Sequence, residues 1–344
     1  MGESKMNKIK NLMSFIIAAA LVSIFCCACT SNSNNTEVSN EASKDETKNI
    51  VFVSRGMSDM YAAFVAESFE NVAKKDYPNY KVTILDLDDD FSKNGDFIDT
   101  AISMGADAVV GQFLLVDPVD AARRALEEGV PVVCIDELHE DSYGKFAQVT
   151  ADNYAIGEMV AEAAAEVLPE NAKVGIISIT TSPITVQRDS GIRDKLAELR
   201  ADVEIVDQAD CDYDKNTAIQ IATDWITEYG QLDGILGDSD TCALGAIEAY
   251  RAAGLDISKT VFYGVDGGSD GCYSIKQGEM AGSVLQSANE YASKSLDICQ
   301  QYFDGKIDMK STTEQPHITI TPVLITSDNV DEYIEMYTEA GVMK

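Results

Sequence analysis

The chain has 344 residues, of which 58 are Asp or Glu and 26 are Lys or Arg, so its formal net charge is −32 at neutral pH. Such an acidic chain repels nucleic acids and phosphate-rich ligands, and we exclude both as partners. The length leaves room for two folded domains after the N-terminal segment.

The first 28 residues have the features of a signal peptide. Three lysines lie within the first ten residues, and the apolar run 15–28 that follows covers about 21 Å as a helix, which is too short to cross the ~30 Å core of a bilayer. The run ends in Ala28 and Cys29, and this ending resembles a bacterial lipoprotein signal. The resemblance implies that residues 1–28 are removed and that Cys29 carries the lipid; Cys27 and an uncleaved anchor helix are the alternatives.

Val38 is the only large aliphatic side chain in residues 29–48, which consist mostly of Thr, Ser, Asn and charged residues. Such a segment cannot bury enough apolar surface to fold. We therefore expect a flexible linker between a lipid anchor at Cys29 and a folded part that begins at Asn49.

Strand-like and helix-like patterns alternate after the linker. Short β-branched runs indicate buried strands, and apolar residues at helical spacing indicate amphipathic helices. The first half predicts strands at 49–53, 81–87, 106–112 and 130–137, with helices at 62–75, 96–105 and 120–129. This alternation predicts a parallel sheet with helices on both faces.

The second half repeats the pattern about 125 residues later. It predicts strands at 172–178, 203–208, 232–238 and 259–268, with helices at 188–200, 217–230 and 242–254. The first of these helices is expected to bury Ile192, Leu196 and Leu199 on one face. A repeat this long is typical of two similar α/β lobes and not of a solenoid.

Ligands of open α/β sheets bind outside the carboxyl ends of the strands, so two facing lobes should enclose a cleft. The strand ends of the first half offer Ser54, Asp59, Tyr61, Asp86, Gln112, Asp136 and Glu137, and those of the second half offer Thr180, Arg188, Asp212, Tyr213, Asp238, Ser239, Asp240 and Asp266. Donors, acceptors and aromatic faces together suit a polyhydroxylated ligand. Any single Asp could instead cap a turn or a helix.

Seven stretches carry a family resemblance: "ISMGADAVV", "ALEEGVPVVCIDE", "TADNYAIGEMVAE", "QRDSGIRDKL", "CALGAIEAYRAAG", "YGVDGGSDG" and "IKQGEMAGSVLQ". With them, residues 49–344 resemble type I periplasmic-binding proteins of the sugar type, the group of the ribose- and galactose-binding proteins of ABC importers. The resemblance implies two lobes joined by three crossovers near 150–153, 286–288 and 319–321. The N-terminal lobe would comprise 49–151 plus 287–319, and the C-terminal lobe 152–286 plus 320–344.

The resemblance also implies roles for single residues. Asp59 stands at a ligand-bonding Asn position, and Tyr61 and Tyr213 stand at stacking aromatic positions. Further ligand-binding positions match Asp136, Arg188, Asp266 and Gln286, and we add Gln112 and Ser239 from the strand ends. The chain departs from the family pattern at Ala62, Gly111, Ser239 and Glu137, so an ordinary pentose or hexose is not implied.

Glu137 replaces an Arg and Asp59 replaces an Asn of the family pattern, and both changes make the site more negative. Buried carboxylates need hydrogen-bond donors or a counter-charge. We therefore include Glu137 in the ligand site and predict donor-rich ligands, such as amino sugars or polyols, over acidic sugars. The alternative is that Glu137 turns outward and pairs with Lys145 or Arg55.

Together these features predict a monomeric, extracytoplasmic solute-binding lipoprotein that delivers a sugar-like ligand to the transmembrane subunits of an ABC permease. The two alternatives are a sensor that presents the ligand to a membrane kinase or chemoreceptor, and an exported enzyme on a similar fold. We expect no catalytic residues, no cofactor and no metal. The five cysteines after Cys29 are expected to be mostly small buried residues, and His139 and His317 ordinary surface residues.

Overall fold

The computed structural model describes residues 46–137, 139–142, 144–212, 214–310 and 313–339. The predicted signal peptide, Cys29, most of the predicted linker and Tyr213 lie outside the described residues. Within the described residues, no helix combines the length and the apolar character that a membrane crossing requires.

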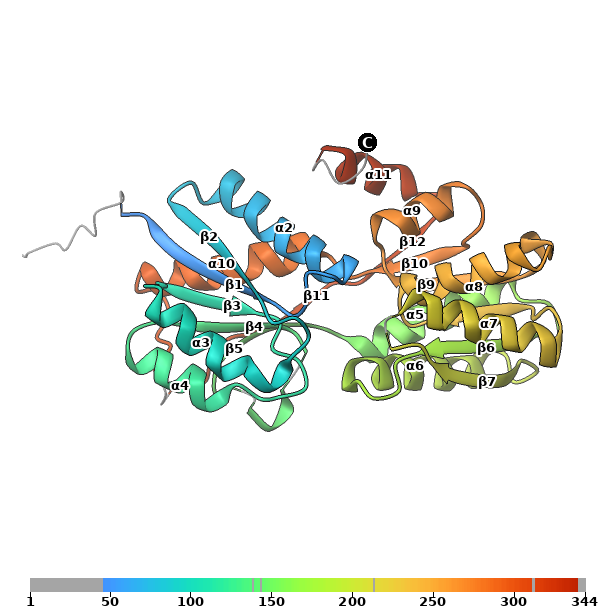
Figure 1. The fold of residues 1–344 in the computed structure, drawn as a ribbon, viewed down its shortest axis with the longest axis horizontal. Helices are drawn as coiled ribbons and strands as arrows, with labels where there is room; N and C mark the ends of the chain where they lie inside the picture. The colour runs from blue at the N-terminus through green and yellow to red at the C-terminus, as the bar shows by residue number, and fades with distance from the viewer. Residues whose placement is uncertain (1–45, 138, 143, 213, 311–312, 340–344) are drawn as a thin grey trace, which may run out of the picture. The chain divides into compact units, whose positions relative to one another are not determined.

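Lobe 1 is built on a sheet of six parallel strands in the order β11-β5-β4-β3-β1-β2. The strands are β1 (Lys48–Ser54), β2 (Tyr80–Asp86), β3 (Ala108–Gly111), β4 (Val132–Asp136), β5 (Ala147–Ala151) and β11 (His317–Ile320). Helices α2 (Met60–Asp76) and α10 (Ala288–Phe303) pack together on one face, and α3 (Asn94–Ser103) and α4 (Val119–Glu127) on the other (Figure 1).

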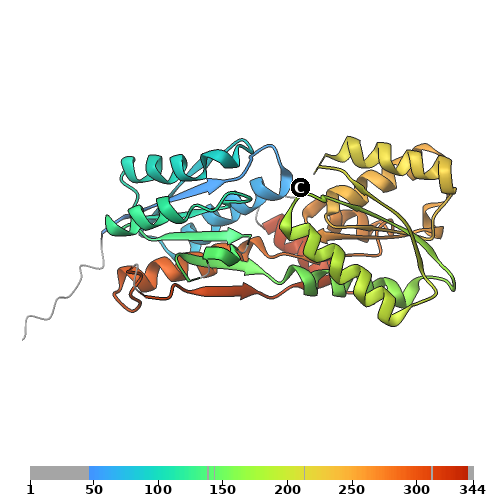
Figure 2. The same cartoon turned by 90° about the horizontal axis from the view of Figure 1, so that it is seen from below.

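Lobe 2 has a second six-stranded sheet in the order β12-β10-β9-β8-β6-β7, in which β12 alone is antiparallel to its neighbour. The strands are β6 (Lys173–Ser178), β7 (Glu204–Asp210), β8 (Gly234–Gly237), β9 (Val261–Asp266), β10 (Gly282–Leu285) and β12 (Val323–Thr326). The helices are α5 (Asn153–Val167), α6 (Pro183–Leu199), α7 (Lys215–Tyr229), α8 (Asp240–Ala252), α9 (Ser269–Lys276) and α11 (Val330–Glu339). Contacts pair α5 with α6, α7 with α8, and α9 with α11 (Figure 2).

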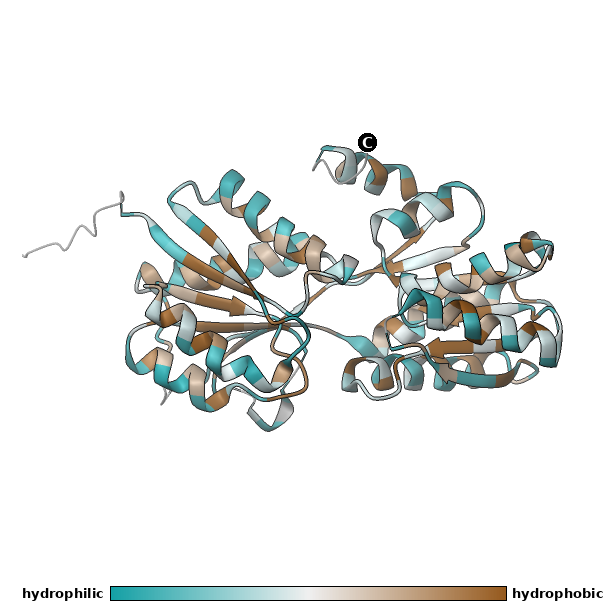
Figure 3. Cartoon of the chain, viewed as in Figure 1, coloured by the Kyte–Doolittle hydropathy of each residue, from teal (hydrophilic) through white to brown (hydrophobic). Residues whose placement is uncertain are grey.

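Both faces of each sheet are apolar, which explains why the sequences of the strands are continuous hydrophobic runs. In β1, Ile50 and Phe52 enter one core while Val51 and Val53 enter another on the opposite face. All four side chains are at most 2% exposed. The strands accordingly consist mainly of apolar residues, whereas the helices contain many polar residues (Figure 3). The predicted fold class of two parallel-sheet lobes is confirmed.

Three short segments connect the sheets: β5 leads into α5, β10 leads into α10, and β11 leads into β12. The first lies at 151–153, the second at 285–288 and the third at 320–323, close to the crossovers that the family resemblance implied. The lobe limits given above stay our proposed domain boundaries.

Two expectations were wrong. Leu199, expected on the buried face of its helix, is 48% exposed because it is the last residue of α6. His139, expected at the surface, is buried, and its Nε2 lies 2.6 Å from the carbonyl oxygen of Phe113. The burial of the cysteines was predicted correctly, since the five that follow Cys29 are all buried: Cys134, Cys211, Cys242, Cys272 and Cys299.

Two glycines let α5 and α6 approach each other. A Cβ atom on Gly157 would lie 2.0 Å from the carbonyl oxygen of Arg188, and one on Gly191 would lie 2.2 Å from that of Tyr154. Real Cβ atoms do not come this close to backbone atoms, so both positions require glycine. The contact holds the α6 turn that carries Arg188 against α5.

We predict that Gly157→Ala lowers the free energy of unfolding by about 1–3 kcal/mol, because the added methyl group must push α6 away. Chemical denaturation measures the change. Gly95→Ala in α3 is the matched control, since a Cβ there would meet Ala121 at an ordinary 3.5 Å, and Ala is the better helix former. Equal stability of the Gly157→Ala variant and the wild type would contradict the close-packing argument.

Candidate functional site

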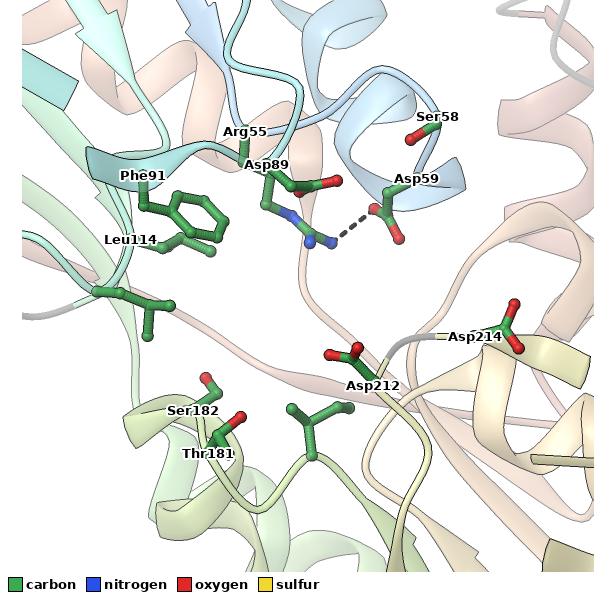
Figure 4. Close-up of a pocket in the computed structure, with 12 residues that line it drawn as sticks. Arg55, Ser58, Asp59, Asp89, Phe91, Leu114, Thr181, Ser182, Asp212 and Asp214 are labelled. Atoms are coloured by element: carbon green, nitrogen blue, oxygen red, sulfur yellow. Dashed lines mark hydrogen bonds and ion pairs between the residues drawn. The ribbon is translucent and has the colours of Figure 1, made fainter. Parts of the chain in front are cut away.

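A cavity of about 470 Å³ lies at the carboxyl ends of strands from both lobes, and we call it the outer cavity. Its walls come from the loops after β1, β2 and β3 and from the loops after β6 and β7. Figure 4 shows these side chains, with Arg55 and Asp59 on one side and Thr181, Ser182 and Asp212 on the other. The lining residues are Arg55, Ser58, Asp59, Asp89, Phe91, Leu114, Leu115, Ile179, Thr181, Ser182, Asp212 and Asp214.

A second, deeper space adjoins it, which we call the inner pocket. It is lined by Arg55, Asp59, Tyr61, Leu114, Asp136, Ile184, Arg188, Ser239, Thr241, Asp266 and Gln286. Arg55, Asp59 and Leu114 line both spaces. The inner pocket alone holds about 20 Å³, enough for a water molecule but not for a sugar. A sugar-sized ligand that contacts its polar groups must therefore extend into the outer cavity.

The inner pocket brings together most of the residues that the sequence singled out. Seven of them line it: Asp59, Tyr61, Asp136, Arg188, Ser239, Asp266 and Gln286. Gln112 does not line it but lies behind it, where its Nε2 donates to Asp136 Oδ2 at 3.3 Å. Tyr213 lies outside the described residues, so its predicted stacking role stays a prediction.

Glu137 is placed differently from the other predicted residues. It lines neither space, and it is buried with its Oε2 accepting the backbone N–H of Leu115 at 2.8 Å. Its side chain thus holds the loop after β3, whose Leu114 and Leu115 line the outer cavity. Burial raises the pKa of Glu137, and the bond from Leu115 partly offsets that rise.

Asp136 and Asp266 occupy equivalent places in the two sheets. Each ends the third strand of its sheet, β4 in lobe 1 and β9 in lobe 2. Each also has a positive φ, 81° for Asp136 and 109° for Asp266, in a region that side-chain-bearing residues seldom adopt. Such strain costs on the order of 1–3 kcal/mol and is typical of functional positions.

The glycine-rich turn after Asp266 does not use the Asp266 carboxylate as its cap. The N–H of Gly268 donates to Asp240 Oδ2 at 2.8 Å, and the hydroxyl of Ser283 donates to Asp240 Oδ1. Asp266 Oδ1 instead accepts from Gln286 Nε2 at 3.1 Å. Asp240 therefore holds the turn, and the Asp266 carboxylate faces the inner pocket.

Two buried guanidinium groups accompany these carboxylates. Arg188 donates from Nε to Asn153 Oδ1 at 3.0 Å and from Nη1 to the carbonyl oxygen of Asp238 at 2.7 Å. Arg55 donates from Nη2 to Asp59 Oδ1 at 2.6 Å (Figure 4). Sequence reasoning missed Arg55 as a site residue, although it directly follows the predicted strand end Ser54 and so had the same positional signal as the others.

Burial dominates the electrostatics of the inner pocket. It raises the pKa of Asp136, with Arg55 and Arg188 acting in the opposite direction. It also raises the pKa of Asp266 well above the usual range, and the neighbouring Asp240 raises it further. The site therefore holds carboxyl groups for which hydrogen-bond donors from a ligand would compensate the lost hydration.

A family model described as the periplasmic binding protein domain matches residues 50–307, three quarters of the chain. The chain belongs to the periplasmic binding protein family. Members of this family that resemble the chain are sugar-binding components of ABC transporters, and the family is extracytoplasmic.

Three relatives illustrate the match. The ribose import binding protein RbsB of Bacillus subtilis is 29% identical over 248 residues, which cover 70% of this chain and 76% of that protein. A xylitol-binding protein of Mycolicibacterium smegmatis is 27% identical over 310 residues, covering 86% and 81%. The crystal structure of a Caulobacter myo-inositol binding protein, bound to myo-inositol, is 28% identical, has a TM-score of 0.70 and covers 84% and 97%.

The buried Asp240 of this periplasmic binding protein should make its stability depend on pH. Burial raises the pKa of Asp240 to about 7 in the folded state, whereas the unfolded value is about 3.9. The folded chain therefore binds the extra proton between about pH 4 and pH 7, so this group makes the protein less stable as pH rises through that window.

We predict that the Asp240→Asn variant loses less stability than the wild type as pH rises, because Asn is never ionised. Its free energy of unfolding, relative to that of the wild type, should increase by roughly 1–3 kcal/mol between about pH 4 and about pH 8. Thermal unfolding at several pH values measures this change. Asp120→Asn is the control: Asp120 also lies in the first turn of a helix, but its side chain is 86% exposed. A difference between Asp240→Asn and the wild type that is the same at every pH would contradict the prediction.

Proposed function

We propose that this periplasmic binding protein captures a neutral polyhydroxylated ligand, a sugar or a polyol, and delivers it to an ABC importer without changing it chemically. The observation that carries the proposal is the pair of strained aspartates that line the inner pocket, Asp136 and Asp266, at equivalent strand ends beside Arg55 and Arg188. An extracytoplasmic family of transport components supports the transport role over an enzymatic one.

The chemistry of the inner pocket matches hydroxyl groups. A carboxylate accepts hydrogen bonds from adjacent hydroxyls, and a guanidinium fork donates to ligand oxygens. Tyr61 adds an aromatic ring next to these groups, and its hydroxyl donates to the carbonyl oxygen of Gln286 at 3.1 Å. Ribose, xylitol and myo-inositol, the ligands named for the three relatives, all carry several neighbouring hydroxyls.

The contacts of the acidic residues favour neutral ligands over amino sugars. Amino sugars were expected because of the carboxylates of Glu137 and Asp59, but the Leu115 N–H binds the Glu137 carboxylate and Arg55 pairs with Asp59. Asp136 and Asp266 then face the ligand together with Arg188 and Arg55. An acidic sugar would add a negative charge to a pocket that has three carboxylates and two guanidinium groups, so we expect it to be rejected.

The ligand can be found by mass spectrometry of the small molecules that the purified protein carries, followed by a thermal-shift panel of ribose, xylitol, myo-inositol, glucosamine and glucuronate. A ligand at 100 times its dissociation constant stabilises the protein by about 2.7 kcal/mol. We expect a neutral sugar or polyol to give the largest shift. Tight binding of glucuronate, or conversion of the bound compound during incubation, would overturn the proposal.

We predict that Asp266→Ala weakens binding of that ligand at least tenfold, since removing a charged hydrogen-bond partner costs about 1.5–3 kcal/mol. Isothermal titration calorimetry measures the affinity, and circular dichroism checks the fold. Asp270→Ala is the matched control because Asp270 lies four residues further along the chain, in the first turn of α9, and is exposed. If Asp266→Ala keeps its affinity and only melts at a lower temperature, Asp266 has a structural role instead.

We also propose that Cys29 is lipidated after removal of residues 1–28 and that the linker 29–48 tethers the monomeric protein to the membrane. The support is the sequence pattern, together with the extracytoplasmic family. We predict that Cys29→Ser appears in the medium or as unprocessed precursor, whereas Cys27→Ser, the control, is processed normally. Metabolic labelling with a fatty acid distinguishes the outcomes, and a labelled Cys29→Ser protein would move the assignment to Cys27.

A further inference from the structure

Two thiols contact each other directly behind the wall of the outer cavity. Cys211 follows the last residue of β7 and precedes Asp212, which lines the outer cavity. Cys242 lies in the first turn of α8, next to Thr241 of the inner pocket. Their Sγ atoms are 2.8 Å apart, and both residues are fully buried.

This separation is within about 1 Å of the length of a disulfide bond, about 2.05 Å. Two other cysteines have different neighbours: Cys134 Sγ lies 3.8 Å from the carbonyl oxygen of Ile135, and Cys272 Sγ lies 3.5 Å from that of Gly267. Only a small movement of the two side chains would therefore bring Cys211 and Cys242 to bonding distance.

We propose that Cys211 and Cys242 are joined by a disulfide in the exported protein, and that this bond ties the loop after β7 to the first turn of α8. Extracytoplasmic compartments are the places where disulfides form and persist, and the family is extracytoplasmic. The inference needs export of the chain but does not depend on which ligand the site binds.

The oxidation is a thiol–disulfide exchange with an external disulfide, such as an oxidised dithiol oxidoreductase or oxidised glutathione. One protein thiol loses its proton and attacks a sulfur of that disulfide, which releases one external thiol and leaves a mixed disulfide. The second protein thiol loses its proton and displaces the remaining external thiol. Two protein thiols are thereby oxidised, and one external disulfide is reduced to two thiols.

The burial of the pair indicates when the bond forms. In the folded protein, burial raises the pKa of Cys242 well above its usual range, and the contact with Cys211 raises it further, so the reactive thiolate is scarce. The exchange therefore takes place while the chain folds, before α8 and the loop after β7 exclude solvent. Afterwards the same burial shields the bond from external thiols.

The bond would fix two parts of the ligand site relative to each other. The loop after β7 carries Asp212 and Asp214 of the outer cavity, and the start of α8 carries Ser239 and Thr241 of the inner pocket. Oxidation removes the Cys242 S–H that now lies 3.5 Å from Asp238 Oδ1, but Asp238 keeps the N–H of Ile179 at 2.7 Å. The buried Asp238 thus retains a hydrogen-bond donor.

Peptide mapping of the wild-type protein tests the bond directly. The full chain is exported by its own N-terminal segment, quenched in acid, alkylated in denaturant and digested with trypsin without reductant. Trypsin separates the two cysteines into peptides 201–215 and 216–251, each with one cysteine. We expect the two peptides linked in one ion that disappears on reduction. Recovery of both as separate alkylated peptides would overturn the proposal, whatever the ligand experiments show.

A second measurement tests whether the bond supports the site wall. We expect the exported wild type to melt about 5 °C lower after it has been reduced in denaturant and refolded with reductant present, since the bond closes a loop of about 30 residues. The Cys211→Ser, Cys242→Ser double variant should not respond to reductant, whereas the control Cys299→Ser, which changes a buried cysteine of α10, should respond like the wild type. An equal response of the double variant and the wild type would contradict the role assigned to this pair.

Discussion

The direction of the strands is the constraint on which the site depends. Apart from β12, all strands of both sheets run parallel to their neighbours, so the carboxyl ends of the strands lie along one edge of each sheet. Residues far apart in the sequence, such as Arg55, Asp136 and Asp266, come together there because each directly follows or ends a strand. Helices cover both faces of the sheets, which leaves these edges as the place where polar side chains can converge on a ligand.

Bringing acidic side chains together at these edges removes them from water, which disfavours their charged form. Asp136, Asp238, Asp240 and Asp266 all have pKa values raised by burial. Asp238 and Asp240 receive backbone N–H donors from Ile179 and Gly268, as is usual for structural carboxylates. Asp136 and Asp266 receive amide donors from the side chains of Gln112 and Gln286. The difference separates the acidic residues that hold the walls from those that face the pocket.

The sequence was sufficient for the fold class and for most of the residues that line the inner pocket, because strand ends can be recognised from hydrophobic patterns alone. The sequence was insufficient where the position of a side chain depends on which hydrogen-bond partner it contacts. Glu137 follows a strand end like Asp136, yet it turns to the N–H of Leu115, a backbone group that no pattern locates in advance. His139 is buried for a similar reason, since its partner is the carbonyl oxygen of Phe113 in the loop after β3. The contact between Cys211 and Cys242 depends in the same way on packing between α7 and α8.

Gln286 shows how one residue can link the two lobes to the ligand. It lies on the connection between β10 of lobe 2 and α10 of lobe 1. Its carbonyl oxygen accepts from Tyr61 of lobe 1, and its side-chain amide donates to Asp266 of lobe 2. Its Oε1 is buried and has no hydrogen-bond partner among the described residues. A buried acceptor without a donor is costly. The segment that joins the lobes therefore carries an unmet hydrogen-bonding need at the same side chain whose amide donates to Asp266 of the inner pocket.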